Sequence, residues 1–254
     1  MRLQVPWFLV LLSGCVPSGP PTQPDAGAPS APPQKPKAAA TAQAPRAAAR
    51  PDAGQGGSSP LGAGFEDTFE RAALGSDWRV TGGDWRIDEG RLCGKSARNH
   101  PVWLARALPV NVRIEFDAVS YSPEGDIKAE VFGDGASAAT ASSYNDATSY
   151  LTIFGGWKNH FHVLARLNEH ASDRPEIRIA PGSDDERARP VVMGQVYHFK
   201  IERTDGRTIS WWIGDTLMFR FTDPQPLSGV GHDHFGFNDW EIRVCFDNVK
   251  VTPV

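Results

Sequence analysis

The chain of 254 residues has a formal net charge of -4, and its composition divides it into two unlike regions. Residues 16–64 contain 11 Pro, 13 Ala and 7 Gly and no aromatic residue, whereas residues 65–254 contain seven of the eight Trp. Residues 65–254 also carry 28 acidic side chains against 21 basic ones. A phosphate backbone is bound by basic surfaces, so this acidic balance excludes nucleic acid as an expected partner.

The first fifteen residues, MRLQVPWFLVLLSGC, have the order of an export signal. Arg2 precedes an apolar run over 5–12 that is too short to span a bilayer, which takes about 20 apolar residues. The end of this segment, Leu12-Ser-Gly-Cys15, resembles the lipobox of bacterial lipoproteins, in which the cysteine after the cleavage point receives a diacylglycerol. We predict a lipoprotein signal peptide over 1–14 and lipidation of Cys15. The alternative is an ordinary secretory signal with a chance cysteine.

By the same resemblance, Val16 in place of Asp favours the outer membrane. We therefore expect a lipid-anchored protein of the bacterial cell envelope that contacts the membrane only through its lipid, each buried CH₂ contributing about 0.8 kcal/mol. Residues 15–64 are predicted to be a disordered, semi-extended Pro/Ala-rich tether. Repeated Pro removes backbone donors, and no large side chains are available to build a core.

Residues 65–254 are predicted to form one all-β domain. Val112–Val119 alternates apolar and charged residues with the period of a half-buried strand. Asp205-Gly206 and Gly214-Asp215 lie between such runs and indicate hairpins. Further strands are expected at 127–132, 150–154, 160–167, 176–179, 197–202, 208–213, 216–221 and 242–251. More than ten short strands, with no sustained helical period, predict a two-sheet antiparallel sandwich.

Both ends of this region resemble concanavalin A-like lectin/glucanase domains. The opening is similar at Phe65-Glu-Asp-Thr-Phe69, Leu74-Gly-Ser-Asp-Trp78 and Trp85-Arg-Ile-Asp-Glu-Gly-Arg-Leu92, and the close at Phe235-Gly-Phe-Asn-Asp-Trp240 and Cys245-Phe-Asp-Asn-Val-Lys-Val251. Segments 154–159 and 165–170 resemble uncharacterised bacterial members of this group. The resemblance covers nearly all of 65–254 and implies a jelly roll in which the first and last strands pair. It leaves the activity open, because this sandwich carries lectins, glycosidases, lyases and adhesive modules.

The sequence lacks the pair of carboxylates that hydrolysis of a glycosidic bond normally uses. Laminarinase-like hydrolases of this fold carry Glu-x-Asp-x-x-Glu on one strand, and the nearest match is Glu115-Phe-Asp117-Ala-Val-Ser120. Because Ser120 stands in the place of the second Glu, we interpret Glu115 and Asp117 as solvated carboxylates. The acidic loop 184–186 has the same interpretation. We assign no catalytic residue, which favours a binding protein over an enzyme.

Asp67 and Asp247 are candidate ligands for a structural calcium ion, which the resemblance implies near the paired termini. Their alternative role is to hydrogen-bond the backbone of turns. Zinc is not expected, because it needs three or four convergent ligands and nothing in the sequence shows that the histidine pairs come together in the fold. Cys93 and Cys245 form an even pair once Cys15 is lipidated, and in an exported protein they are either a disulfide or two buried thiols.

Two segments, 155–160 and 231–240, combine aromatic rings with planar polar side chains, as carbohydrate sites do. Trp more often fills a core, so we expect one of Trp157 and Trp240 to be exposed rather than both. The candidate glycan-binding residues are Trp157, His160, Arg166, His232, His234, Asn238 and Trp240. The favoured function is non-catalytic glycan binding. The alternatives are a glycoside hydrolase or polysaccharide lyase with an unorthodox active site, and a module that binds an envelope protein.

We predict that Cys15→Ala leaves the exported protein soluble, because the variant has no thiol to acylate. Fractionation of producing cells should find the wild type in the membrane pellet and the variant in the soluble exported fraction. Unchanged membrane retention of the variant would contradict the lipoprotein assignment.

Overall fold

The computed structural model describes residues 61–254, so the signal peptide of 1–14, Cys15 and most of the predicted tether lie outside the described residues. Within 61–254 the chain forms fifteen strands, the four-residue turn α1 (Gly156–Asn159) and the short 3-10 turn η1 (Glu186–Ala188). No helix in this part of the chain is long and apolar enough to cross a membrane. Leu61 is buried and its N–H donates to the carbonyl of Ala107 at 3.0 Å, so packing begins just before the first strand.

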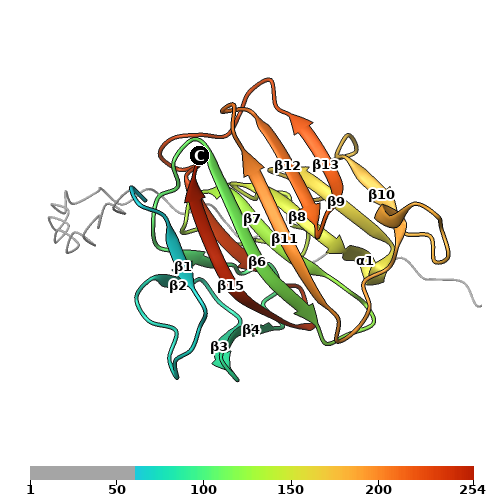
Figure 1. Ribbon diagram of the computed structural model, residues 1–254, viewed down its shortest axis with the longest axis horizontal. Helices are drawn as coiled ribbons and strands as arrows, with labels where there is room; N and C mark the ends of the chain where they lie inside the picture. The colour runs from blue at the N-terminus through green and yellow to red at the C-terminus, as the bar shows by residue number, and fades with distance from the viewer. Residues whose placement is uncertain (1–60) are drawn as a thin grey trace, which may run out of the picture. The chain divides into compact units, whose positions relative to one another are not determined.

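The strands form two antiparallel sheets. The first contains β1 (Phe65–Asp67), β3 (Asp84–Asp88), β4 (Arg91–Lys95), β6 (Val112–Ser120), β11 (Val196–Arg203), β12 (Thr208–Ile213), β13 (Thr216–Thr222) and β15 (Arg243–Pro253). Its order is β13-β12-β11-β6-β15-β4-β3, with β1 also paired to β15. Figure 1 shows β12, β11, β6 and β15 side by side.

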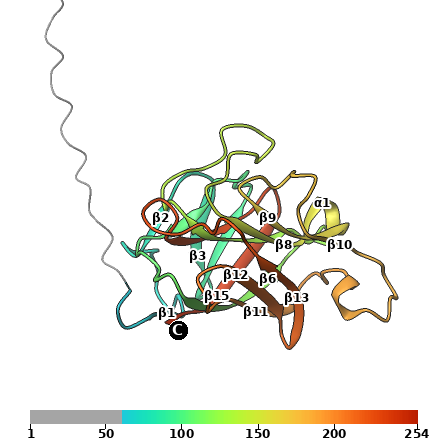
Figure 2. The same ribbon diagram turned by 90° about the horizontal axis from the view of Figure 1, so that it is seen from above.

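The second sheet has the order β10-β9-β8-β7-β14-β5-β2. Its strands are β2 (Trp78–Val80), β5 (Val102–Leu104), β7 (Ile127–Gly133), β8 (Tyr150–Gly155), β9 (Phe161–Arg166), β10 (Glu176–Arg178) and β14 (His234–Asn238). Seen from above, the two sheets lie as two layers (Figure 2). The predicted two-sheet antiparallel sandwich is therefore confirmed, and its first and last strands pair, with Phe65 opposite Val251.

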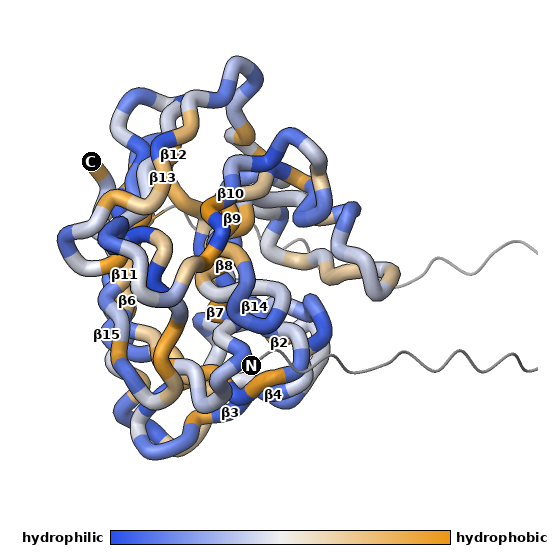
Figure 3. Tube along the Cα trace, turned by 90° about the vertical axis from the view of Figure 1, so that its right-hand side faces the viewer, coloured by the Kyte–Doolittle hydropathy of each residue, from blue (hydrophilic) through white to orange (hydrophobic). Residues whose placement is uncertain are grey.

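Aromatic side chains from both sheets fill the space between the layers. Phe116 on β6 stacks on Phe199 of β11 with ring centroids 4.7 Å apart, and it meets Phe237 of β14 edge-on at 5.0 Å. Phe237 in turn stacks on Phe246 of β15 at 3.9 Å. Hydrophobic residues concentrate on the strands and hydrophilic ones in the connections (Figure 3). Each buried aromatic side chain contributes on the order of 1.5–3 kcal/mol.

The outer face of the second sheet is covered by the chain's own loop. Trp103 on β5 lies on this face, where Gly133 and Gly236 leave room for its indole ring. A Cβ at Gly133 would come within 2.4 Å of the ring and one at Gly236 within 2.7 Å. The indole N–H donates to the carbonyl of Ser137 at 3.0 Å. The β7–β8 connection, residues 134–149, is thereby held above the layer (Figure 2).

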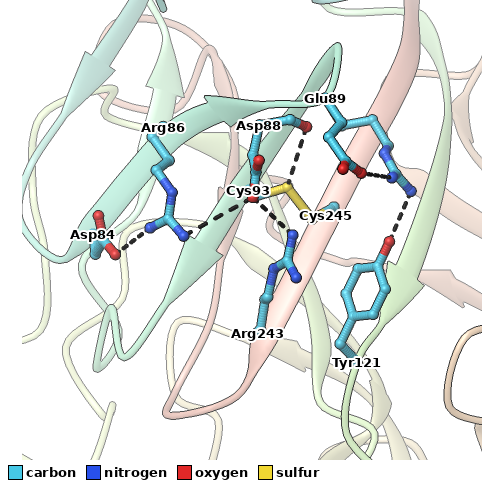
Figure 4. Close-up of a disulfide and its surroundings, with 9 residues drawn as sticks. Asp84, Arg86, Asp88, Glu89, Cys93, Tyr121, Arg243 and Cys245 are labelled. Carbon is cyan, nitrogen blue, oxygen red and sulfur yellow. Dashed lines mark hydrogen bonds and ion pairs between the residues drawn. A yellow bond between two sulfur atoms is a disulfide. The ribbon is translucent and has the colours of Figure 1, made fainter.

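Cys93 on β4 and Cys245 on β15 lie opposite each other in neighbouring strands of the first sheet. Their Cα atoms are 4.0 Å apart and their sulfurs are joined as a disulfide. Figure 4 shows this bond beside the ion pair of Arg243 with Asp88, whose atoms are 2.7 Å apart. The disulfide closes a loop between residues separated by 152 positions.

We predict that replacing Cys93 and Cys245 by Ala, in a Cys15→Ala background, lowers the free energy of unfolding by about 3–5 kcal/mol. The cross-link restricts the unfolded chain, and a long closed loop gives a large effect in the chain-entropy model. Urea denaturation with and without reductant measures the difference. Reductant should destabilise the Cys15→Ala protein and leave the variant without cysteines unchanged; equal stability of the two oxidised proteins would contradict the prediction.

Candidate functional site

Three segments meet at one end of the second sheet. In the register of this sheet Ile127 of β7 lies opposite Phe154 of β8, and Lys128 lies opposite Asn238 of β14. The start of β7 is therefore flanked by the end of β8 on one side and the end of β14 on the other. Trp157 and Trp240 follow those two ends, so the fold brings together residues that are far apart in the sequence.

A cavity of about 510 Å³ lies at this meeting point. Trp157 and Trp240 are both partly exposed and both line it, so the expectation that only one of them reaches the surface is wrong. The reason is that both follow strands that end beside the start of β7. The cavity is lined by Glu124, Asp126, Lys128, Ser142, Trp157, Lys158, Glu169, His170, Trp240, Glu241 and Ile242.

The turn that carries Trp157 has an unusual backbone. Trp157 has φ 51° and ψ 53°, Lys158 has φ 58° and ψ 49°, and Asn159 has φ 62°, all in the left-handed region. This conformation costs L-residues about 1–2 kcal/mol each, so it persists only where neighbours hold it. The side chain of Asn159 provides such contacts: its Nδ2 donates to the carbonyl of Val191 at 2.8 Å, and its Oδ1 accepts the Val191 N–H at 2.9 Å.

The indole of Trp157 is also fixed by its neighbours. The guanidinium carbon of Arg174 lies 4.3 Å from the ring centroid, and the ring of His170 meets the indole edge-on at 5.6 Å. Arg174 and His170 both belong to the β9–β10 connection. An aromatic wall that is already ordered loses little conformational freedom when a ligand binds.

The floor of the cavity is a buried charge cluster around Lys128. The Lys128 ammonium donates to Glu169 Oε2 at 3.2 Å and to Asn99 Oδ1 at 3.1 Å, and it lies 3.7 Å from Asp126 Oδ1. Burial opposes the charge of this amine, but Asp126 and Glu169 outweigh it and raise the pKa of Lys128. Burial raises the pKa of Asp126, and Lys128 offsets only part of that shift. Asp126 also accepts the backbone N–H of Trp240 at 3.2 Å.

Another buried carboxylate, Glu130, lies on β7 and shares a face of the sheet with Lys128. It accepts hydrogen bonds from Ser149 Oγ at 2.5 Å, Asn238 Nδ2 at 2.6 Å and the Tyr144 hydroxyl at 3.0 Å. Tyr144 and Ser149 belong to the 134–149 loop, so Glu130 ties this loop to the sheet. Burial raises the pKa of Glu130 to about 7, although the three donors act in the opposite direction.

Two other candidate residues lie outside the cavity lining. His160 is exposed at the end of the α1 turn, with Nδ1 2.6 Å from the carbonyl of Trp157. Arg166 donates to Asp223 Oδ2 at 2.7 Å and to the carbonyl of Gln225 at 2.8 Å. Both side chains therefore hold neighbouring segments, and a role in glycan binding stays a prediction for each.

The polar candidates of segment 231–240 also make internal contacts. His232 Nδ1 lies 2.7 Å from the carbonyl of Thr148, and His234 Nδ1 lies 2.7 Å from Asp233 Oδ1. Asn238 is fully buried; besides its bond to Glu130, its Oδ1 accepts the N–H of Asp239 at 2.7 Å. None of these three side chains is among the cavity's lining residues. Of the seven predicted glycan-binding residues, the structure thus brings Trp157 and Trp240 together at one cavity.

The two calcium candidates occupy different surroundings. Both carboxylate oxygens of Asp67 are engaged by Arg71, at 2.5 and 2.8 Å, and Trp78 Nε1 donates to Asp67 Oδ2 at 2.8 Å. The guanidinium holds the place that a cation would take. Asp247 accepts the N–H of Asn248 at 2.7 Å on β15. Residues 61–254 contain no group of three or more His, Cys, Asp or Glu side chains placed to hold a metal ion, so the calcium expectation gains no support.

None of Asp126, Lys128 and Glu169 is among the site residues predicted from the sequence. The signal was present, because Asp126, Lys128 and Glu130 alternate with apolar neighbours just as Glu115 and Asp117 do. A period of two shows that side chains share a face and leaves open which sheet and which face they occupy. Asp117 lies on β6 of the other sheet, where His198 Nδ1 contacts its Oδ1 at 2.9 Å.

Neither protein-family models nor curated proteins match the sequence. Solved structures do. The carbohydrate-binding module CBM66 from Bacillus subtilis is similar with a TM-score of 0.50 and 16% identity, over 71% of this chain and 98% of that one. A β-glucanase from Bacillus licheniformis is similar with a TM-score of 0.53 and 8% identity, over 76% of this chain and 100% of that one. The carbohydrate recognition domain of Emp47p is similar with a TM-score of 0.52 and 11% identity, over 74% of this chain and 93% of that one.

At these identities the similarity defines the fold and nothing more. Together with the two antiparallel sheets and the pairing of β1 with β15, it shows that this domain has the jelly-roll fold seen in the β-glucanase and in the Emp47p domain. The sequence resemblance at both ends of residues 65–254 implied this fold, and the expectation is confirmed.

We predict that Glu130 makes the domain less stable as the pH rises from about 4.5 to about 7. Its pKa is 4.5 when unperturbed and about 7 in the folded protein, so in this window the folded state holds a proton that the unfolded chain releases. The contribution is fully present below pH 4.5 and is lost by about pH 7, with an upper size of about 3 kcal/mol.

Urea unfolding of the wild type and Glu130→Gln across this window measures the effect as a difference. His162, whose pKa burial lowers to about 4, has the opposite pH dependence, but it is present in both proteins and cancels. The stability of the wild type relative to the variant should fall with rising pH. Parallel pH profiles of the two proteins would show that Glu130 does not titrate in this way.

Proposed function

We propose that this protein binds a glycan in the 510 Å³ cavity at the end of the second sheet, with Trp157 and Trp240 as the main contacts. The observation that carries the proposal is the pairing of two partly exposed tryptophans with a floor of buried, ordered polar groups. Aromatic faces stack on the apolar face of a sugar ring, and planar polar groups take its hydroxyls.

The floor is suited to sugar hydroxyls in a specific way. Asp126 and Glu169 are acceptors, and the contacts with Lys128 hold both carboxylates in place before a ligand arrives. Charge-assisted hydrogen bonds from hydroxyls to such carboxylates are stronger than neutral ones. Because the acceptors are already fixed, binding loses little side-chain entropy.

Similar folds with carbohydrate-related names support the proposal. CBM66 is named a carbohydrate-binding module, and the Emp47p domain is named a carbohydrate recognition domain. Since the likeness to both is one of fold, the glycan-binding role of this chain rests on its own cavity.

A second candidate function is glycoside hydrolysis in the same cavity. The observation that favours it is the presence of two lining carboxylates, Asp126 and Glu169, of which Asp126 has a raised pKa. Hydrolysis of glycosides commonly uses one protonated and one ionised carboxyl group across the scissile bond. We favour binding, because Lys128 ties both carboxylates to the floor of the cavity, whereas hydrolysis needs the two groups on either side of the scissile bond.

For the cellular setting we propose display from the bacterial envelope by the lipidated Cys15, preferentially at the outer membrane. The support is the order of residues 1–15 and the Pro/Ala-rich composition that follows. A glycan-binding domain on such a tether would reach polysaccharides at a distance from its membrane.

The test of the proposed function is retention of the Cys15→Ala protein on a panel of insoluble and envelope polysaccharides, with analysis of the supernatant for released sugars. Retention without release supports glycan binding and identifies the ligand class. Release of oligosaccharides would establish the hydrolase instead. Absence of both retention and release would favour a protein partner.

We predict that Trp157→Ala and Trp240→Ala each weaken glycan binding about tenfold or more, because truncation of a tryptophan that anchors a ligand commonly costs about 2 kcal/mol. The melting temperature should change little, since both side chains are partly exposed. Isothermal titration with the retained glycan and a thermal melt measure the two effects. Trp212→Ala is the matched control: this indole is also partly exposed, but it lies on β12 of the other sheet under Lys200.

A further inference from the structure

Carboxylates outnumber ammonium groups among the residues that line the cavity. Four carboxylates line it, against the two ammonium groups of Lys128 and Lys158 and the imidazole of His170, which lies 3.3 Å from Glu169. Glu241 also contacts Arg98, at 3.3 Å. Lys158 lies 3.5 Å from Glu124 at the exposed rim, so its charge is already compensated. The acidic lining residues are Glu124, Asp126, Glu169 and Glu241.

In the floor, Lys128 is shared by two acids. It donates hydrogen bonds to Glu169 and to Asn99, and its contact with Asp126 is the longer one at 3.7 Å. Asp126 Oδ2 accepts one backbone N–H, from Trp240, and Asp126 Oδ1 faces only that distant ammonium among the contacts of the described residues. Asp126 is therefore a buried carboxylate, 8% exposed, whose charge is incompletely compensated. The raised pKa of its carboxyl agrees with this geometry.

From this charge distribution we infer that the cavity selects glycans that carry a free, protonated amine, such as units of unacetylated hexosamine, over neutral and acidic glycans. The inference rests on the proposed function and names its ligand class. An ammonium group in the cavity would supply the missing partner of Asp126. The indole of Trp240 favours the same ligand, because the face of an aromatic ring attracts cations.

The same features disfavour acidic sugars. A uronic acid or a sulfated sugar would bring its negative charge against Asp126 and Glu169, while the ammonium groups of Lys128 and Lys158 already contact carboxylates. Like charges brought together in a partly desolvated site oppose binding and so provide specificity. A neutral sugar has no charge, so it is neither attracted nor repelled by these carboxylates.

The experiment compares three oligosaccharides of equal length by isothermal titration with the Cys15→Ala protein at about pH 5, where the amines of glucosamine units are protonated and uronic acids are ionised. The ligands are a β-1,4-linked glucosamine tetrasaccharide, its fully N-acetylated counterpart and a tetragalacturonate. We expect the amine ligand to bind about tenfold more tightly than the acetylated one, with a ratio that falls as salt is added, and the acid to bind most weakly. Equal affinity for the first two ligands, or tightest binding of the acid, would overturn the inference.

Variants separate charge selection from sugar binding. Asp126→Asn should weaken the amine ligand by more than the acetylated one and so reduce the amine preference, because the amide keeps an acceptor for a hydroxyl but loses the negative charge. Glu124→Gln, on the exposed rim, should reduce the preference to a smaller extent and provides the test if Asp126→Asn fails to fold. Trp157→Ala should weaken both ligands together. Glu66→Gln, on β1 and paired with Lys250, is the control and should leave the ratio unchanged.

The outcomes distinguish the inference from the function on which it rests. Binding of the acetylated ligand without an amine preference overturns only the inference. Failure of the folded protein to bind any oligosaccharide, here and in the polysaccharide panel, overturns both. An amine preference that persists unchanged in Asp126→Asn and Glu124→Gln would place the selecting charge elsewhere and would also overturn the inference.

Discussion

The site depends on one buried ammonium group. Lys128 joins the start of β7 to Glu169 in the β9–β10 connection and to Asn99 in the connection between β4 and β5. A charge with so little access to water is tolerated only because acids and an amide surround it. Removal of its partners would leave the charge uncompensated. The positions of the floor and of the wall built by Trp157 are therefore set together, since Glu169 and His170 are adjacent in the chain.

The loop over the second sheet illustrates how small and large residues cooperate in building the site. Gly133 and Gly236 leave a depression that Trp103 fills, and the indole N–H then holds residue 137 of the loop. At the other end of the loop, Glu130 binds Tyr144 and Ser149. The loop is fixed at both ends, and Ser142 between them lines the cavity.

The fold was predictable to a large extent, because the signals for strands are local. Alternation placed most strands to within a few residues, and Asp205-Gly206 and Gly214 mark the hairpins that flank β12. The site was predictable only in part. Trp157 and Trp240 follow from their glycine-rich and polar surroundings, but their convergence depends on the sheet order β8-β7-β14, which no local pattern contains. The same limit explains why Glu130 and Glu115 look alike in the sequence and lie on different sheets.

The covalent loop closed by Cys93 and Cys245 has a consequence for how the protein withstands proteases. Every residue that lines the cavity lies between these two cysteines in the sequence. A single cut in an exposed connection within that span would leave two fragments joined through the sulfurs as well as through the sheets. The nicked molecule would keep both indoles and the charged floor in one piece, so damage to the chain and loss of the site are separate events.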